Sequence, residues 1–408
     1  MERVGRQIRL KGSASLMAGA AKVEITPPVG TPLAGYSKRR GKHSVGIRDP
    51  LYVRAVVLSD GEDTAVIVSA DLLVLPGPLV DKVLRGIFAD LRIPRQAVVL
   101  TATHTHSGAG AIADGFLYER VFGSYDGKIE EGVAARIRWA VKQAVENRKP
   151  VTWGSALDEQ FLAGSVENRD TPGGLVDPSL AVLLLEGQEG QPKAVLVNTA
   201  AHATLMDSQD FRFSADFPGE LCRQIEGIYP GVVCLFINGA AGDARPRDSI
   251  GATPDERIER FGRLLAEGTT ALISRMPTQA KADLAAWGGW FQLPPQQIRL
   301  GPIPVPQEIG QLLRPSSAYF NLVGLEGLVM VPLSGEMTAE LGLRLKQRLA
   351  EQGVQPLLLG YANGYLGYSV TPEQYRAGSY EAAMTWYGPN FGTLMIQDIR
   401  LLSSIYKS

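Results

Sequence analysis

The order of apolar segments in the first hundred residues limits the folds open to this chain. Residues 51–58 and 64–70 are rich in Val and Ile, as β-strands are, and a short polar turn joins them. A helix is expected from Pro78 to about Leu91, and a further apolar strand begins at Val98. A strand, a helix and another strand in this order are typical of an α/β layer. We therefore predict an α/β fold, with a mixed β-sheet core flanked by helices.

The rest of the chain continues this mixture of strands and helices. Residues 128–147 form a clear amphipathic helix pattern, with apolar residues at i, i+4 and i+7. Another helix is expected at 254–275, where Thr253 and Glu256 occupy the positions of a capping box. Residues 277–317 are less regular. The other expected elements are a helix at 337–351 and strands at 21–26, 151–157, 180–186, 194–199, 232–237, 322–333 and 356–361.

No internal repeat, low-complexity tract or clear linker divides the chain. Lys, Arg, Gly and Ser dominate the first residues, so we expect residues 1–16 to be a flexible lead. Residues 17–408 are then expected to form a single catalytic domain. With 45% hydrophobic residues, a domain of this length can bury a substantial core.

The charge balance argues against two classes of partner. The chain has 41 basic and 42 acidic residues, so nothing suggests a nucleic-acid surface or a polybasic membrane patch. No stretch is long and apolar enough to span a bilayer, and the N-terminus lacks the apolar segment of a secretory signal. We therefore expect a cytoplasmic protein, or a secreted one if the N-terminus was processed. Cys222 and Cys234 lack a metal-binding spacing and are expected to be buried thiols, with one disulfide as the alternative.

Three of the four histidines share one context, just beyond an apolar strand. His104 and His106 follow the strand that begins at Val98, and His202 follows the strand at 194–199. Side chains at i and i+2 of an extended chain point the same way, so His104 and His106 can face one cleft. There, neutral imidazole can bind a metal or carry a proton. The alternative is a set of ordinary strand-end histidines, but their recurrence favours a site.

Several short segments resemble, in the same order, the N-terminal catalytic domain of the neutral ceramidase family. The resemblance covers roughly residues 18 to 400, and the combination of THTHSG, GE and the tyrosine-rich NGYLGYSVT segment makes it specific. It implies that family's α/β fold and a metal-dependent hydrolysis. The matching segments are AGAAKVEITPPVG, GIRDPLYVRA, THTHSG, NRD, AAHATLM, NGAAGD, LSGEMTAELGLRL, NGYLGYSVTPEQY and YEAAMTWYGP.

That family holds a single zinc ion with two histidines, a glutamate and a tyrosine. The resemblance implies that His104, His202, Glu336 and Tyr368 bind one Zn²⁺ per chain. Zinc accepts nitrogen and oxygen ligands, and a catalytic zinc site keeps room for water. Water bound to zinc becomes a hydroxide-like nucleophile near neutral pH, and the metal can also polarise a carbonyl.

The resemblance also assigns two roles next to the metal. His106 becomes the proton-transfer group that helps the amine leave, and Arg169 a donor that orients or stabilises the substrate oxygen. The alternatives are a strand-end histidine and a loop arginine in a salt bridge. Asp71 and Asp216 are candidate carboxylates that orient the metal-binding histidines.

The sequence departs from the family pattern in two places. Arg245 stands where the family's true ceramidases carry a required serine, in a loop that reads GDARP here. A planar cation at this position is a candidate for binding an anionic part of a substrate. We assign Asp243, Arg245 and Thr371 to substrate binding. The chain also ends shortly after the tyrosine-rich segment, so the family's C-terminal β-sandwich domain is not expected.

These observations lead to one functional prediction with two alternatives. The chain is expected to be a ceramidase-like hydrolase in which zinc-activated water cleaves a linear amide (N-acyl) bond of a small, lipid-like substrate. The first alternative keeps the zinc but makes the substrate an ester or a peptide-like amide that is not a lipid. The second is a non-catalytic ligand-binding relative, which would be expected to lose some of the metal ligands.

Overall fold

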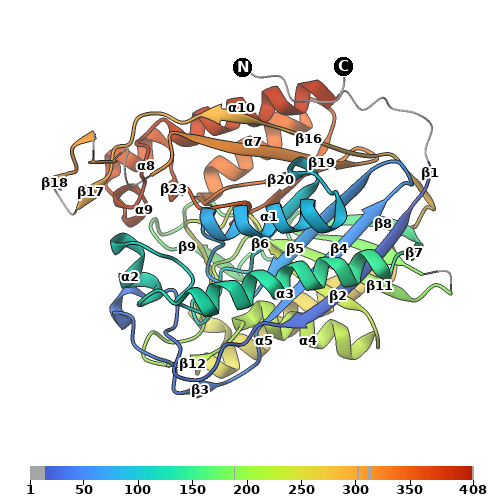
Figure 1. The fold of residues 1–408 in the computed structure, drawn as a ribbon, viewed down its shortest axis with the longest axis horizontal. Helices are drawn as coiled ribbons and strands as arrows, with labels where there is room; N and C mark the ends of the chain where they lie inside the picture. The colour runs from blue at the N-terminus through green and yellow to red at the C-terminus, as the bar shows by residue number, and fades with distance from the viewer. Residues whose placement is uncertain (1–13, 188, 301–302, 308, 311–313, 407–408) are drawn as a thin grey trace.

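The computed structural model describes residues 14–187, 189–300, 303–307, 309–310 and 314–406 (Figure 1). Most of the expected flexible lead, residues 1–13, lies outside the described residues. Strand β1 (Ala14–Ser15) lies within the described end of that segment and pairs with β15 (Lys281–Ala282). Within these described ranges, no helix is long and apolar enough to cross a membrane.

The first large sheet has five strands in the order β6-β5-β4-β2-β7. Its β2, β4 and β5 run antiparallel, whereas β5 and β6 run parallel, because α1 (Gly77–Leu91) carries the chain back across the sheet. α1 and α3 (Gly127–Glu146) lie on its outer side (Figure 1). The strands are β2 (Met17–Glu24), β4 (Tyr52–Ser59), β5 (Thr64–Ala70), β6 (Val98–Ala102) and β7 (Lys149–Pro150).

The second large sheet has the order β13-β11-β10-β8, with β11 and β13 parallel. On β10, Leu183 and Leu185 face the core shared with the first sheet. Val182 and Leu184 face the opposite way, toward α4 (Asp216–Ile228) and α5 (Pro254–Ile273), as the alternation of a strand requires. The strands are β8 (Thr152–Asp158), β10 (Leu180–Glu186), β11 (Pro192–Thr199) and β13 (Val233–Asn238).

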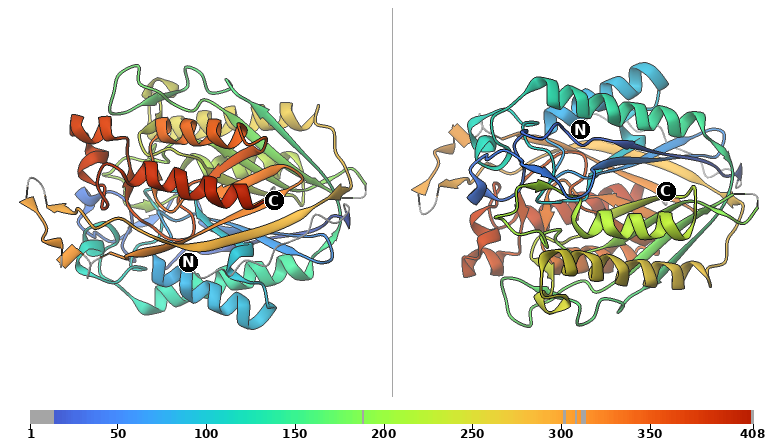
Figure 2. Two further views of the ribbon diagram at one scale, coloured as in Figure 1. Left: turned by 90° about the horizontal axis from the view of Figure 1, so that it is seen from above. Right: turned by 90° about the horizontal axis from the view of Figure 1, so that it is seen from below.

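The third large sheet has the order β16-β19-β20-β22, with β20 and β22 parallel. α7 (Ala339–Ala350) and α10 (Phe391–Tyr406) cover its outer face. In both views of Figure 2, α5 lies on the side of the molecule opposite α1 and α3, with the sheets between them. The strands are β16 (Leu284–Gln292), β19 (Ser317–Leu325), β20 (Leu328–Pro332) and β22 (Gln355–Leu359).

The predicted mixed α/β architecture is confirmed, and three details differ. The run at 322–333 is a hairpin, because Glu326 and Gly327 both adopt positive φ and reverse the chain between β19 and β20. The segment expected to be less regular contains β16, which pairs with β19 along its length. The C-terminal helix α10 was not predicted.

Short strands and helices complete the structure and position the loops at the strand ends. The short strand pairs are β3 with β12, β9 with β14, β17 with β18 and β21 with β23. These elements are β3 (Gly46–Ile47), β9 (Val166–Asn168), β12 (Arg212–Phe213), β14 (Ala244–Pro246), β17 (Arg299–Leu300), β18 (Ile303–Pro304), β21 (Glu336–Met337), β23 (Tyr368–Ser369), α2 (Phe116–Phe122), α8 (Pro372–Ala377), α9 (Tyr380–Ala383), and the 3-10 helices η1 (Ser37–Arg39), η2 (Arg95–Ala97) and η3 (Asp248–Ile250).

Candidate metal centre

The first two histidines reach the site by a different backbone path from the one expected. Strand β6 ends at Ala102, and His104 adopts a left-handed conformation with φ of 67°. The two imidazoles therefore do not share one face of an extended strand. A turn brings them together instead, with their ring centroids 4.8 Å apart. Positive φ is uncommon for a residue with a side chain, and such strain concentrates at functional sites.

The third histidine and the glutamate arrive from the other two large sheets. His202 follows β11, and its main-chain N–H donates to the carbonyl of Ala244 at 2.9 Å. Glu336 and Tyr368 are direct partners in the parallel pairing of β21 with β23. This register places the two side chains next to each other, since paired residues of neighbouring strands project from the same face.

Three donor atoms form a small triangle at the meeting point of these segments. The Nε2 atoms of His104 and His202 are 3.0 Å apart. Oε2 of Glu336 lies 3.3 Å from the first of these nitrogens and 3.4 Å from the second. Tetrahedral zinc, with bonds of about 2.0–2.1 Å, would separate its ligand atoms by about 3.3 Å. The triangle therefore has the dimensions of one face of a zinc coordination shell.

The hydrogen bonds behind the triangle decide which ring nitrogens carry protons. Nδ1 of His104 lies 2.8 Å from the carbonyl of Leu73, and Nδ1 of His202 lies 2.8 Å from that of Ala241. A carbonyl only accepts, so each Nδ1 carries a proton, and in the neutral ring that binds a metal the lone pair is then on Nε2. Both Nε2 atoms then direct lone pairs at each other, and Oε2 of Glu336 has no hydrogen-bond donor among the described residues. A bound cation would resolve this convergence of lone pairs.

Burial and charge keep these groups in the ionisation states that bind metals. Burial, followed by the charges of Arg169 and His104, lowers the pKa of His202 well below its usual range. Burial alone would raise the pKa of Glu336, but the neighbouring His104 imidazole and the hydrogen bond from Tyr365 hold it below its ordinary value. Two neutral imidazoles and a carboxylate are nitrogen and oxygen donors that suit zinc.

The carboxylates expected to orient the histidines do something else, so that prediction was wrong. Asp71 accepts hydrogen bonds from the main chain of Tyr52 and from the buried guanidinium of Arg54. Asp216 accepts from the main-chain N–H groups of Met206 and Phe217. Main-chain carbonyls orient the imidazoles in their place. A carbonyl is an equally common partner of a metal-binding histidine, and it leaves no mark on the sequence.

Tyrosines of the YANGYLGY segment, residues 361–368, line the same centre. The hydroxyl of Tyr365 donates to Oε1 of Glu336 at 2.5 Å, and the ring of Tyr361 stacks on His104 with centroids 3.8 Å apart. Tyr368, the predicted fourth ligand, is buried beside Glu336, and both burial and that charge raise its pKa. Sequence reasoning missed Tyr361 and Tyr365, although the density of tyrosines was a visible signal.

Arg169 lies beside the centre and is held on both sides. Its NH2 donates to the Tyr368 hydroxyl at 3.0 Å, and its Nε donates to Oε1 of Glu381 at 2.8 Å. Glu381 is fully buried, and burial together with a hydrogen bond that its protonated carboxyl donates to Asp170 raises its pKa to about 7 despite the nearby guanidinium. The structure therefore places Arg169 at the predicted site and also in a salt bridge. Glu381 was not identified from the sequence.

His106 shares the centre but has different partners. Its Nε2 is 3.2 Å from Nε2 of His104, and the three imidazoles offer nitrogens that all lie within 4.8 Å of one another. Its Nδ1 is buried and has no hydrogen-bond partner in the part of the chain that the structure describes. His106 can therefore offer a nitrogen to the metal or exchange a proton with a bound molecule.

The three residues assigned to substrate binding make contacts within the protein. The carboxylate of Asp243 accepts from the main chain of Ala339 at 2.7 Å and from two side-chain amides. Thr371 is buried and caps α8 in a capping box. Arg245 is partly exposed, and its NH2 lies 2.8 Å from Oε1 of Glu167, its partner in the β9–β14 pairing. The role of these three residues in substrate binding stays a prediction.

Comparisons with known sequences agree with the motifs. The family model for the N-terminal part of neutral/alkaline non-lysosomal ceramidases matches residues 16–247 and 307–397. Neutral ceramidase B of Dictyostelium discoideum is 22% identical over 98% of this chain and 74% of its own length. The neutral ceramidase of Mycobacterium tuberculosis is 22% identical over 87% of this chain and 71% of its own length. For neutral ceramidase A of D. discoideum the alignment is 25% identical and spans only 32% of that protein.

Solved structures show the same fold. A ceramidase complexed with C2 superposes with a TM-score of 0.85 at 19% identity, over 97% of this chain and 75% of that one. The neutral ceramidase from Pseudomonas aeruginosa gives a TM-score of 0.81 at 20% identity, over 96% of this chain and 75% of that one. With the family match extending over most of the sequence, the chain belongs to the neutral/alkaline non-lysosomal ceramidase family and corresponds to the family's N-terminal domain.

Proposed function

We propose that this protein is a zinc-dependent hydrolase that cleaves the amide bond of an N-acyl, lipid-like substrate. The observation that carries the proposal is the triangle formed by His104, His202 and Glu336, whose lone pairs converge at 3.0–3.4 Å while both Nδ1 protons are held by carbonyls. Tyr368 would complete the ligand set. Zinc held there would supply a Lewis acid and a hydroxide-like nucleophile near neutral pH.

The surrounding residues have the chemistry that amide hydrolysis requires. The Arg169 guanidinium, fixed by Glu381, presents a positive charge beside the metal centre, where it can stabilise the oxygen of a tetrahedral intermediate. Nε2 of His106 faces the metal centre, 3.2 Å from Nε2 of His104, so a substrate bound at the metal would lie beside it. Burial lowers the pKa of His106, so the ring is neutral at rest and can accept a proton from water and pass it to the departing nitrogen.

The substrate class rests on the family, whose members are named for ceramide hydrolysis. The direct test measures hydrolysis of a short-chain N-acyl sphingoid base and of the matched carboxylic ester, before and after chelation. We expect amide hydrolysis that chelation abolishes and added zinc restores. Turnover that survives both chelation and Glu336→Gln would overturn the proposal. Cleavage of the ester alone would favour the esterase alternative.

A further inference from the structure

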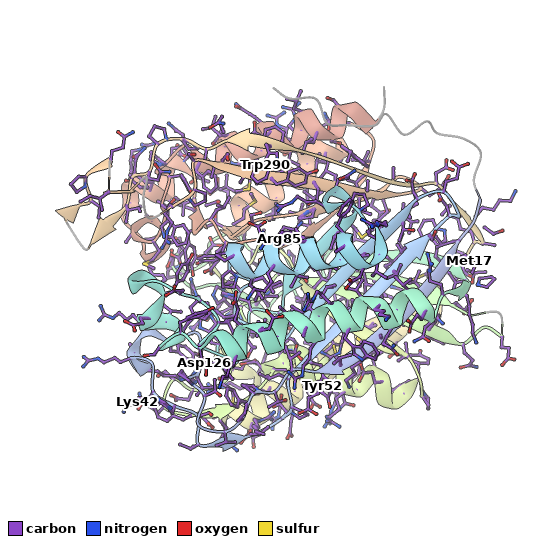
Figure 3. All side chains as sticks on the ribbon, in the orientation of Figure 1. Met17, Lys42, Tyr52, Arg85, Asp126 and Trp290 are labelled. Atoms are coloured by element: carbon purple, nitrogen blue, oxygen red, sulfur yellow. The ribbon has the colours of Figure 1, made fainter. Side chains whose placement is uncertain are left out.

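A loop that the proposed mechanism does not use packs against the proton-transfer histidine. Residues 25–45 connect β2 to β3, and this connection reaches the edge of the molecule, where Figure 3 labels Lys42. At Gly35 the loop passes His106 so closely that an added Cβ would lie 2.7 Å from the Cα of His106. The two residues of interest, Tyr36 and Arg39, follow this approach.

Arg39 is 2% exposed, and its guanidinium donates almost entirely to main-chain carbonyls. One of these carbonyls belongs to His106 itself, and the neighbouring Ser107 hydroxyl accepts another bond. A buried guanidinium with four main-chain carbonyls among its acceptors holds loops together, because its five donors form a rigid, planar fork. The acceptors are the carbonyls of His106, Asp207, Ser208 and Asp210 and the Ser107 hydroxyl.

Tyr36 fills the space between this guanidinium and the imidazole. Its ring centroid lies 4.9 Å from that of His106 and 4.8 Å from Cζ of Arg39. Its hydroxyl donates to the carbonyl of Met206 at 2.8 Å and approaches that of Thr204 at 3.2 Å. The ring is therefore fixed at both ends. Arg39, Tyr36 and His106 form a column that we call the His106 clamp.

We infer that the His106 clamp positions the imidazole for proton transfer, and that Tyr36 and Arg39 are positioning residues of the reaction. This inference rests on the proposed function. His106 has no hydrogen bond from its own Nδ1 to a described residue, unlike His104 and His202, whose rings are held by carbonyls. Apart from the 3.2 Å contact between its Nε2 and that of His104, the His106 ring is held by packing and by its backbone, and the clamp supplies both.

The inference makes a prediction about leaving groups. The nitrogen of an amide leaves slowly unless it is protonated, whereas nitrophenolate leaves without a proton. Loosening the clamp should therefore reduce amide hydrolysis and spare the hydrolysis of a p-nitrophenyl ester with the same acyl chain. A general loss of fold or metal would reduce both rates together.

The test compares Tyr36→Leu and Arg39→Gln with Arg40→Gln, which makes the same change at an exposed neighbouring arginine. For both clamp variants we expect kcat for the amide to fall about tenfold or more with little change in KM, while ester turnover stays within about twofold. Zinc content should equal that of the wild type. Arg40→Gln should match the wild type on both substrates.

A readout independent of turnover comes from the histidines themselves. Only four histidines are present, so nitrogen-15 NMR of their rings yields a small set of signals, which His106→Gln assigns. In Tyr36→Leu we expect the His106 signal to shift or broaden and that of the exposed His43 to stay in place. An unchanged His106 signal, or an equal loss of amide and ester turnover with full zinc, would overturn the inference. A wild type that hydrolyses neither substrate would instead refute the proposed function and leave the NMR test of the clamp intact.

Discussion

Replacing Glu336 with Gln should reverse the order of stability of the two proteins when zinc is removed. In the metal-free wild type, Oε2 of Glu336 is a buried carboxylate oxygen without a hydrogen-bond donor among the described residues. It also faces two imidazole lone pairs at 3.3 and 3.4 Å. The glutamine amide can keep the bond from Tyr365 through its oxygen and donate through its nitrogen to those imidazoles.

The expected differences in stability between the wild type and Glu336→Gln follow from these contacts. A buried polar group without a partner costs about 1–3 kcal/mol, so metal-free Glu336→Gln should be more stable than metal-free wild type by that amount. With zinc at about a thousand times its dissociation constant, the wild type gains about 4 kcal/mol, and the variant, lacking one ligand, gains far less. For a chain of 408 residues, 1 kcal/mol corresponds to about 1 °C in Tm.

Thermal unfolding at pH 8.5, where neutral imidazole prevails, measures the order of stability of the two proteins with and without zinc. In chelator, the variant should melt about 1–3 °C above the wild type. In excess zinc, the variant should melt at a lower temperature than the wild type. Glu351→Gln, an exposed glutamate on the surface, serves as the matched control and should follow the wild type in both conditions. The same order of Tm values with and without zinc would refute the lone-pair argument.

Four further outcomes are expected. His106→Gln should retain zinc but lower amide turnover by about 10²–10⁴-fold, measured beside metal content. Arg245→Ala should lose more activity on carboxylate-bearing than on neutral N-acyl substrates, and equal losses would remove Arg245 from recognition. Burial raises the pKa of Asp216 to about 6, so the folded state binds the proton of this carboxyl more tightly than the unfolded state does. The tighter binding contributes up to about 3 kcal/mol to the free energy of unfolding. This contribution is fully present below about pH 4 and is lost as the pH rises through 6. Urea titrations from pH 4 to 8 should show that the free energy of unfolding depends less on pH in Asp216→Asn than in the wild type. Phe391→Ala, at the buried first residue of α10, should lower the free energy of unfolding by about 3–5 kcal/mol in the same assay.

The fold was predictable where periodicity was strong. The amphipathic helix predicted at 128–147 is α3, Gly127–Glu146, and the helix predicted at 254–275 is α5, Pro254–Ile273. Strand β16 was missed because Gly288 and Gly289 weaken its strand signal. Gly288 is needed there, since a Cβ would lie 2.7 Å from the Phe320 carbonyl of β19.

Helix α10 was missed although its signal was present. Its buried residues follow helical spacing, and they complete the core beneath the third sheet. The buried residues at this spacing are Phe391, Met395, Ile399 and Leu402.

The site was predictable only as far as motifs mark it. His104, His106 and His202 stand at strand ends, and the structure brings them together. The groups around them are set by packing between distant segments. The carbonyls that orient two of the imidazoles and the buried Arg39 that binds the backbone of His106 carry no local sequence pattern.

The central claim is that His104, His202 and Glu336 hold a zinc ion. Metal content per chain, measured on protein purified without chelator and then supplied with zinc, tests it most directly. We predict about one zinc per chain in the wild type, a marked loss in His202→Ala and normal content in His43→Ala, whose histidine is exposed and outside the histidine cluster. Wild-type protein that binds no zinc, or His202→Ala that binds as much as the wild type, would contradict the account.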